Sequence, residues 1–280
     1  LIDKKNKIKY DISSLMYIHN LDPVLINFGF FEVRWYSLAY IVGILIGWWV
    51  AKKIILFKTK NRINLFNINL FDDLISYIII SIILGGRIGY IIFYNFTYYI
   101  GNPLDIFKIW QGGMSFHGAF IGVIIGTYIF AKKNKSNIFF FLDIIATVAP
   151  IGIFFGRIAN FINGELYGRE SSFFLSVVFP KIDMLARHPS QLYEALLEGI
   201  VLFSILIIVI FKKGTKIGMC SSLFMILYGF FRILAEQFRE PDIQIGYLAD
   251  LFSMGSALSF VMILVGFIIF VKVRNNDIYK

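Results

Sequence analysis

Long apolar runs separated by short polar connections dominate the pattern along the chain. Each run approaches the ~20 residues that a helix needs to cross a bilayer. Because lipid offers no partner for a free backbone N–H or C=O, each run is expected to be a complete helix. The predicted spans are residues 35–56, 70–94, 115–131, 138–162, 190–211, 217–236 and 253–272. The pattern therefore predicts an all-α integral membrane protein with seven transmembrane helices.

The composition agrees with this prediction and excludes a soluble domain. Hydrophobic residues make up 58% of the 280 residues and charged residues 16%, and the mean hydropathy is +0.73. Soluble chains contain about 45–50% apolar and about 25% charged residues. The net charge of +9 is spread over short clusters between the apolar runs, so nucleic acid is not an expected partner. The lone cysteine, Cys220, allows no intrachain disulfide and excludes a cysteine-based metal site.

Lysine and arginine are concentrated in alternate connections, which predicts the side of the membrane that each connection faces. The basic residues of the first, third and fifth connections are Lys52, Lys53, Lys58, Lys60, Arg62, Lys132, Lys133, Lys135, Lys212, Lys213 and Lys216. The second connection holds only Lys108, and the sixth is net acidic. The N-terminus is therefore expected to face outward, to the periplasm, and the C-terminus to face the cytoplasm. The lysines within residues 4–9 disagree, but they lie more than ~20 residues from the first span, where the bias is weak.

This orientation divides the chain into three predicted parts. They are an outward arm (1–34), a seven-helix membrane domain (35–272) and a cytoplasmic tail (273–280). The longest outward connection, residues 163–189, is expected to form a small outward-facing subdomain.

Polar residues inside or bordering the spans gather toward one face of the membrane. They are Arg87, His117, Arg157, Asn160, Asn163, Glu165, His188, Arg232 and Glu236. An arginine at the bilayer centre costs at least ~2.5 kcal/mol on insertion scales, so these residues call for a functional or structural reason. With the predicted orientation, each lies near the outward end of its span. The pattern predicts one polar site at the depth where lipid head groups meet acyl chains.

Several of these residues also have a structural explanation. Arg87 is either a lipid contact or an arginine that snorkels or joins helices. Arg232 and Glu236, four residues apart on one helix face, are either site residues or a structural ion pair. His117 also fits an interfacial helix start, and His188 also fits a helix N-terminus. The structural explanation is weakest for Arg157 and Asn160 within GRIANFINGELYGR (156–169), because a helix end rarely needs so many amide and charged groups.

The chemistry of such a site follows from its charge. Several arginines at head-group depth form an anion site, and the abundant local anion is a phospholipid phosphate. The chain contains no HExxH, GxSxG or P-loop sequence, so no metal or cofactor is predicted. The residues alone indicate a membrane protein that handles phospholipid.

Five segments together resemble prolipoprotein diacylglyceryl transferases, a bacterial enzyme family. They are GGRIGYIIFYN (85–95), GGMSFHGAFIG (112–122), GRIANFINGELYGR (156–169), RHPSQLYEALLEG (187–199) and YGFFRILAEQFREPD (228–242). WYSLAY (35–40) and the SMG at 253–255 also match, so the resemblance covers about residues 21–272. The chain departs from the family pattern at Ala119, Ala159 and Ser256, which are all small residues.

The resemblance implies an activity and a set of site residues. The family has seven transmembrane helices in the bacterial cytoplasmic (inner) membrane, with the active site toward the periplasm. Its members transfer the diacylglyceryl group of phosphatidylglycerol to the lipobox cysteine thiol of a prolipoprotein signal peptide and release glycerol 1-phosphate. The implied catalytic residues are His117, Arg157, Arg232 and Tyr36. The implied phosphatidylglycerol-binding residues, to which we add Arg87, are Arg157, Asn160, Glu165, Gly168, Tyr228, Arg232 and Glu236.

Two questions stay open at this point. The thiol is activated either by His117 as a general base or by the field of the arginines. A transporter or permease for an anionic or lipid substrate is the alternative function, although the chain lacks the internal repeat that is common in that class. A structural membrane protein is a further alternative, and it explains GRIANFINGELYGR poorly.

Overall fold

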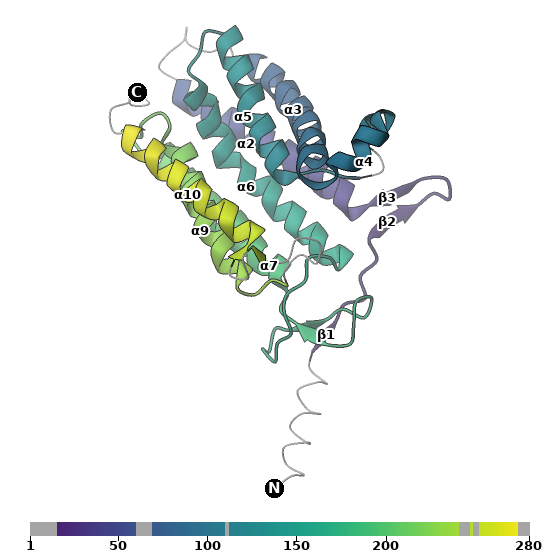
Figure 1. Cartoon of the computed structure of the whole chain (residues 1–280). Helices are drawn as coiled ribbons and strands as arrows, with labels where there is room; N and C mark the ends of the chain where they lie inside the picture. Colours follow the sequence, from purple (N-terminus) through teal and green to yellow (C-terminus); the bar gives the residue numbers. More distant parts are fainter. Residues whose placement is uncertain (1–15, 60–68, 110–111, 241–246, 249–251, 274–280) are drawn as a thin grey trace.

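The computed structural model describes residues 16–59, 69–109, 112–240, 247–248 and 252–273. Within these ranges the chain is mostly helical (Figure 1). Its long helices are α2 (Trp35–Thr59), α3 (Asn69–Tyr94), α5 (Phe116–Lys133), α6 (Ile138–Asn163), α9 (Met219–Glu236) and α10 (Met254–Val273). Another helical stretch is continuous from α7 (Ser190–Glu194) through the π-helical η3 (Ala195–Val201) to α8 (Leu202–Phe211).

These helices agree with the predicted spans to within a few residues. Six candidate membrane spans are found in the described residues, and they lie at Trp35–Lys58, Phe71–Tyr94, Ile138–Asn163, Ser190–Phe211, Met219–Glu236 and Gly255–Val273. The helix predicted for 115–131 forms as α5, but α5 is not among these six, so a seventh span stays a prediction. Residues 1–15 of the predicted arm, 60–68 of the first connection and 274–280 of the predicted tail lie outside the described residues.

Helix α6 lies at the centre of the bundle. It packs against α2, α5, α8, α9 and η3, while α3 packs against α5 and α9 against α10 (Figure 1). The Asn137 side chain accepts a hydrogen bond from Phe139 N and begins α6. Gly164 ends the helix in the left-handed conformation, with φ of 70°. This central position brings the C-terminal end of α6, with its polar residues, against several other helices.

Glycines bring α3 and α5 into close contact. A Cβ atom at Gly89 would lie 2.6 Å from the Cα of Gly118, and a Cβ at Gly85 would lie 2.9 Å from the Cα of Gly122. Side chains at these positions would force the helices apart, as in other membrane helix pairs with small interface residues. The contact fixes the N-terminal turn of α5, where His117 precedes Gly118.

The connection 163–189 contributes two strands, and the segment before α2 one strand, to a small sheet at one end of the bundle. Strand β1 (Tyr17–Ile18) pairs in parallel with β4 (Val177–Val178), which pairs antiparallel with β5 (Ala186–Arg187) (Figure 1). Arg187 Nη2 lies 2.6 Å from Asp183 Oδ2, and this hydrogen bond holds the pKa of the Asp183 carboxyl below its usual value.

The hairpin of β2 (Val24–Asn27) and β3 (Glu32–Arg34) and the short helix α4 (Phe96–Gly101) project from the bundle beside the long helices (Figure 1). The hairpin leads directly into α2. The helices α4 and η1 (Pro103–Phe107) follow α3. Strands β6 (Tyr247–Leu248) and β7 (Phe252–Ser253) form a two-stranded pair before α10.

Candidate active site

Arginine and glutamate side chains form a buried cluster between the C-terminal ends of α6 and α9 and the first turns of the α7–η3 helix. The members of this arginine–glutamate cluster are Arg157, Arg232, Arg239, Glu194, Glu198 and Glu236. The cluster lies at the end of the bundle where α7 begins (Figure 1). The structure thus brings together Arg157 and Arg232, the two arginines that the family resemblance implies as catalytic and phosphatidylglycerol-binding residues.

Both predicted arginines are already paired with carboxylates. Arg157 lies 2.9 Å from Glu194 and 3.1 Å from Glu198. Arg232 lies 2.6 Å from Glu194 and 2.8 Å from Glu236. The predicted ion pair between Arg232 and Glu236 therefore exists, but it belongs to a larger network. Such pairing allows arginines to lie inside a membrane-spanning bundle, where an isolated charge is costly.

Glu194, Glu198 and Arg239 are not among the site residues predicted from the sequence. Glu194 and Glu198 have no exposed surface, and Arg239 is 6% exposed. The two glutamates lie in the predicted span 190–211, where an ionisable residue is itself a sign of function. Glu198 lies within the π-helical stretch η3, a conformation that recurs at functional sites.

Asn160, in the last turn of α6, is joined by hydrogen bonds to Glu165 in the segment after the helix. Asn160 Nδ2 donates to Glu165 Oε1 at 2.7 Å, and the Glu165 amide donates to the Asn160 carbonyl at 3.1 Å. The beginning of α7 fixes this turn from the other side. Gln191 Nε2 donates to the Glu165 carbonyl at 2.6 Å, and Ser190 Oγ donates to the Leu166 carbonyl at 2.8 Å. The segments 156–169 and 187–199, predicted as separate motifs, thus interlock.

Gly168 lies where two backbone segments meet. Its amide donates to the His188 carbonyl at 2.9 Å, and a Cβ atom would lie 2.5 Å from the carbonyl oxygens of His188 and Phe238. Gly168 therefore shapes the site by permitting close backbone packing.

His188 Nδ1 lies 3.2 Å from the Tyr193 hydroxyl, and burial lowers the pKa of His188. These contacts favour the helix N-terminus explanation for His188.

The remaining predicted residues interact with arginines of the cluster, Tyr36 only through Tyr40. Tyr228 is buried on α9 and interacts electrostatically with Arg157 and Arg232. His117 is partly buried and lies within electrostatic range of Arg232. The hydroxyl of Tyr36 lies 3.3 Å from that of Tyr40, which in turn interacts with Arg157. In the part of the chain that the structure describes, no group of three His, Cys, Asp or Glu side chains could hold a metal ion.

Arg87 occupies a separate cage of backbone carbonyls. Its guanidinium donates to the carbonyls of Asp105 and Gly112 at 2.6 Å and of Ile106 at 2.9 Å, and it stacks on Tyr99. It is 4% exposed. Contacts of this kind tie α3 to the segment before α5, and they favour the structural explanation of Arg87 over phosphatidylglycerol binding.

Replacing Arg87 by alanine tests this assignment. The variant leaves several buried carbonyls without a donor, so its melting temperature in detergent is expected to fall by roughly 4–8 °C. Its KM for phosphatidylglycerol is expected to stay within about threefold of the wild-type value. Arg34→Ala, which removes a largely exposed ion pair with Glu32, is the matched control and should change neither quantity. A tenfold rise in KM with an unchanged melting temperature would instead assign Arg87 to lipid binding.

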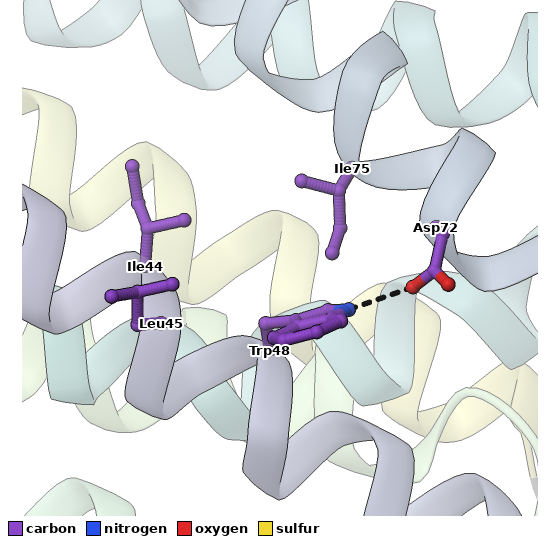
Figure 2. Close-up of a pocket in the computed structure, with 5 residues that line it drawn as sticks. All are labelled: Ile44, Leu45, Trp48, Asp72 and Ile75. Carbon is purple, nitrogen blue, oxygen red and sulfur yellow. Dashed lines mark hydrogen bonds between the residues drawn. The ribbon is translucent and has the colours of Figure 1, made fainter.

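A hollow of about 300 Å³ lies between α2 and α3, away from the cluster. Figure 2 shows its lining residues, Ile44, Leu45, Trp48, Asp72 and Ile75. Trp48 Nε1 donates to Asp72 Oδ1 at 2.8 Å. Trp48 follows Tyr36 by twelve residues on α2, roughly 18 Å at 1.5 Å per residue. Because of this separation we do not place the reaction in the hollow.

Comparison with known proteins identifies the family of the chain. The family model for prolipoprotein diacylglyceryl transferase matches residues 23–272. A protein of Rickettsia bellii (strain OSU 85-389) named phosphatidylglycerol–prolipoprotein diacylglyceryl transferase is 51% identical over 263 residues, which cover 93% of this chain and 98% of the relative. A Rickettsia felis protein (strain ATCC VR-1525 / URRWXCal2) of the same name is 52% identical over 249 residues, covering 88% and 95%. The chain therefore belongs to the prolipoprotein diacylglyceryl transferase family.

Proposed function

We propose that the protein transfers the sn-1,2-diacylglyceryl group of phosphatidylglycerol to the thiol of the lipobox cysteine of a prolipoprotein, releasing glycerol 1-phosphate. The observation that supports this most strongly is the pair Arg157 and Arg232. They converge from α6 and α9 on one buried cluster, within a chain that matches the family over residues 23–272. Phosphatidylglycerol and prolipoprotein, the substrates in the names of these relatives, fit an anion site inside a membrane protein.

For this reaction the protein must stabilise negative charge and accept one proton. The thiolate sulfur attacks the glyceryl carbon, a C–S bond forms, and the electron pair of the C–O bond leaves with the phosphate. Negative charge therefore grows on the phosphate oxygens. Arg157 and Arg232 are placed to stabilise that charge in a site with little exposure to water.

The thiol must lose its proton before or during the attack. His117 is the proposed general base, and its place near Arg232 at the start of α5 supports that role. The competing proposal is that the arginines alone favour the thiolate. Asn160 and Glu165, joined by their hydrogen bond, are proposed to orient the head group or the arginines.

We also propose that the protein crosses the bacterial cytoplasmic membrane seven times, with α5 as the remaining span. The distribution of basic residues supports a periplasmic N-terminus and a cytoplasmic C-terminus. In this orientation the cluster and the small β1–β4–β5 sheet face the periplasm, where a prolipoprotein presents its lipobox cysteine.

A transfer assay tests the proposed function. The purified protein in detergent is incubated with phosphatidylglycerol and a lipobox peptide that contains one free cysteine. The peptide is expected to gain the mass of a diacylglyceryl group, and phosphatidylethanolamine in place of phosphatidylglycerol serves as the head-group control. Movement of unaltered lipid across vesicles that hold the protein, without any change in peptide mass, would favour the permease alternative.

A further inference from the structure

The arginine–glutamate cluster is formally neutral, although the proposed substrate is an anion. Three arginines face three glutamates, and Glu194 and Glu198 have no exposed surface. The carboxylates therefore compete with a bound phosphate for the same guanidinium groups. The affinity of the site for phosphate therefore depends on these carboxylates as well as on the arginines.

Glu194 contacts more of the cluster than the other two glutamates do. Its Oε1 lies 2.6 Å from Arg232 Nη1 and 3.3 Å from Arg239 Nη1, and its Oε2 lies 2.9 Å from Arg157 Nη1. These arginines come from α6, from α9 and from the segment after α9. One carboxylate thus sets the spacing between arginines that belong to different parts of the chain.

The contacts of Glu198 and Glu236 are fewer. Glu198 lies 3.1 Å from Arg157 and 3.8 Å from Arg232, and Glu236 pairs with Arg232. Among the described residues, Glu194 Oε2, Glu198 Oε1 and Glu236 Oε2 all lack a hydrogen bond of good geometry, so the three glutamates differ only in how many arginines they contact. Glu194 therefore lies at the centre of the cluster, and Glu198 is a second, weaker counter-charge.

We infer that Glu194 is a positioning residue that aligns Arg157 and Arg232 and limits their affinity for phosphate. This inference rests on the proposed function. A phosphodiester carries one negative charge, and the glycerol 1-phosphate product carries up to two. Arginines without a counter-charge would hold this product more tightly than the substrate and slow its release. The Glu194 carboxylate opposes that binding by repulsion and keeps both guanidinium groups in register.

Two substitutions separate charge from position. Glu194→Gln removes the charge with little change in shape, so the inhibition constant of glycerol 1-phosphate is expected to fall by about tenfold or more, together with kcat. Glu194→Asp keeps the charge but withdraws the carboxylate by one methylene. It is expected to lower kcat by about 10–100-fold while the inhibition constant stays within about threefold of the wild-type value. A residue needed only for folding would not lower the inhibition constant in one variant and leave it unchanged in the other.

The controls distinguish failure of this inference from failure of the proposed function. Glu240→Gln removes a carboxylate that pairs with Arg187 at 3.3 Å, outside the cluster, and should leave both quantities unchanged. Glu198→Gln should shift the inhibition constant in the same direction as Glu194→Gln. If Glu194→Gln does not yield folded protein, Glu194→Asp decides the matter, and an unchanged kcat in that variant overturns the inference. An inhibition constant that stays unchanged or rises in the folded glutamine variant, beside an active wild type, overturns the inference alone. Absence of thioether product from both wild type and Glu240→Gln would overturn the proposed function.

Discussion

Replacing Arg157 by alanine is expected to lower kcat/KM for diacylglyceryl transfer by about 10²–10³-fold, and Arg232→Ala is expected to do the same. In the proposed mechanism each guanidinium stabilises charge that grows on the leaving phosphate, and water has little access to replace it. Arg157→Lys should recover only part of the activity, because an ammonium keeps the charge but loses the planar fork. The measurement is the initial rate of glycerol 1-phosphate release at several phosphatidylglycerol concentrations.

Loss of folding must be separated from loss of chemistry in this experiment. Arg157→Ala leaves Glu194 and Glu198 with fewer partners, and breaking a buried ion pair from one side costs about 3–5 kcal/mol. The double variant Arg157→Ala/Glu198→Gln removes one of the orphaned charges. It is expected to recover melting temperature without recovering activity. Near-wild-type activity in the folded double variant would contradict the role of Arg157 as a phosphate ligand.

His117→Gln is expected to lower kcat by about 10²–10⁴-fold at neutral pH, the usual contribution of a general base. Glutamine keeps the polar character of the position but cannot accept the thiol proton. The rate should rise with pH in the variant more steeply than in the wild type, because hydroxide then supplies the thiolate. The measurement is the pH profile of kcat with a lipobox peptide, from pH 6 to 9 or beyond.

Activation of the thiol by the arginines alone predicts a different activity and pH profile for His117→Gln. If the arginines alone activate the thiol, His117→Gln keeps most of its activity and the two pH profiles run parallel. The matched control is His188→Gln. His188 contacts Tyr193 and the Gly168 backbone, and its substitution should leave the pH profile unchanged.

The helices could be predicted from the sequence because a membrane imposes a strong constraint on it. Lipid requires closed backbone hydrogen bonding over ~20 apolar residues, so the apolar runs and the helices nearly coincide. For α6 the predicted range 138–162 differs from the observed Ile138–Asn163 by one residue. The π-helical stretch Ala195–Val201 was not predictable in this way, since its residues have the same apolar pattern as an α-helix.

The site could be predicted only in part. Arg157, Asn160 and Glu165 belong to one short motif; Asn160 is hydrogen-bonded to Glu165, whereas Arg157 pairs with Glu194. Glu194 and Glu198 could have been identified from the sequence, because they are two carboxylates inside an apolar run. Their pairing with Arg157, however, depends on how α6 and α7–η3 pack. The assignment of Arg87 required the structure as well, because its partners are backbone carbonyls and have no side-chain signature.

The central claim is that the buried arginines hold the phosphate of phosphatidylglycerol while a prolipoprotein thiol displaces it. The most direct test measures glycerol 1-phosphate release and peptide mass together, with a lipobox peptide and its cysteine-to-serine counterpart. We expect one glycerol 1-phosphate for each thioether formed, no release with the serine peptide, and loss of both products in folded Arg157→Ala/Glu198→Gln. Glycerol 1-phosphate released without thioether, or equal release with the serine peptide, would contradict the account.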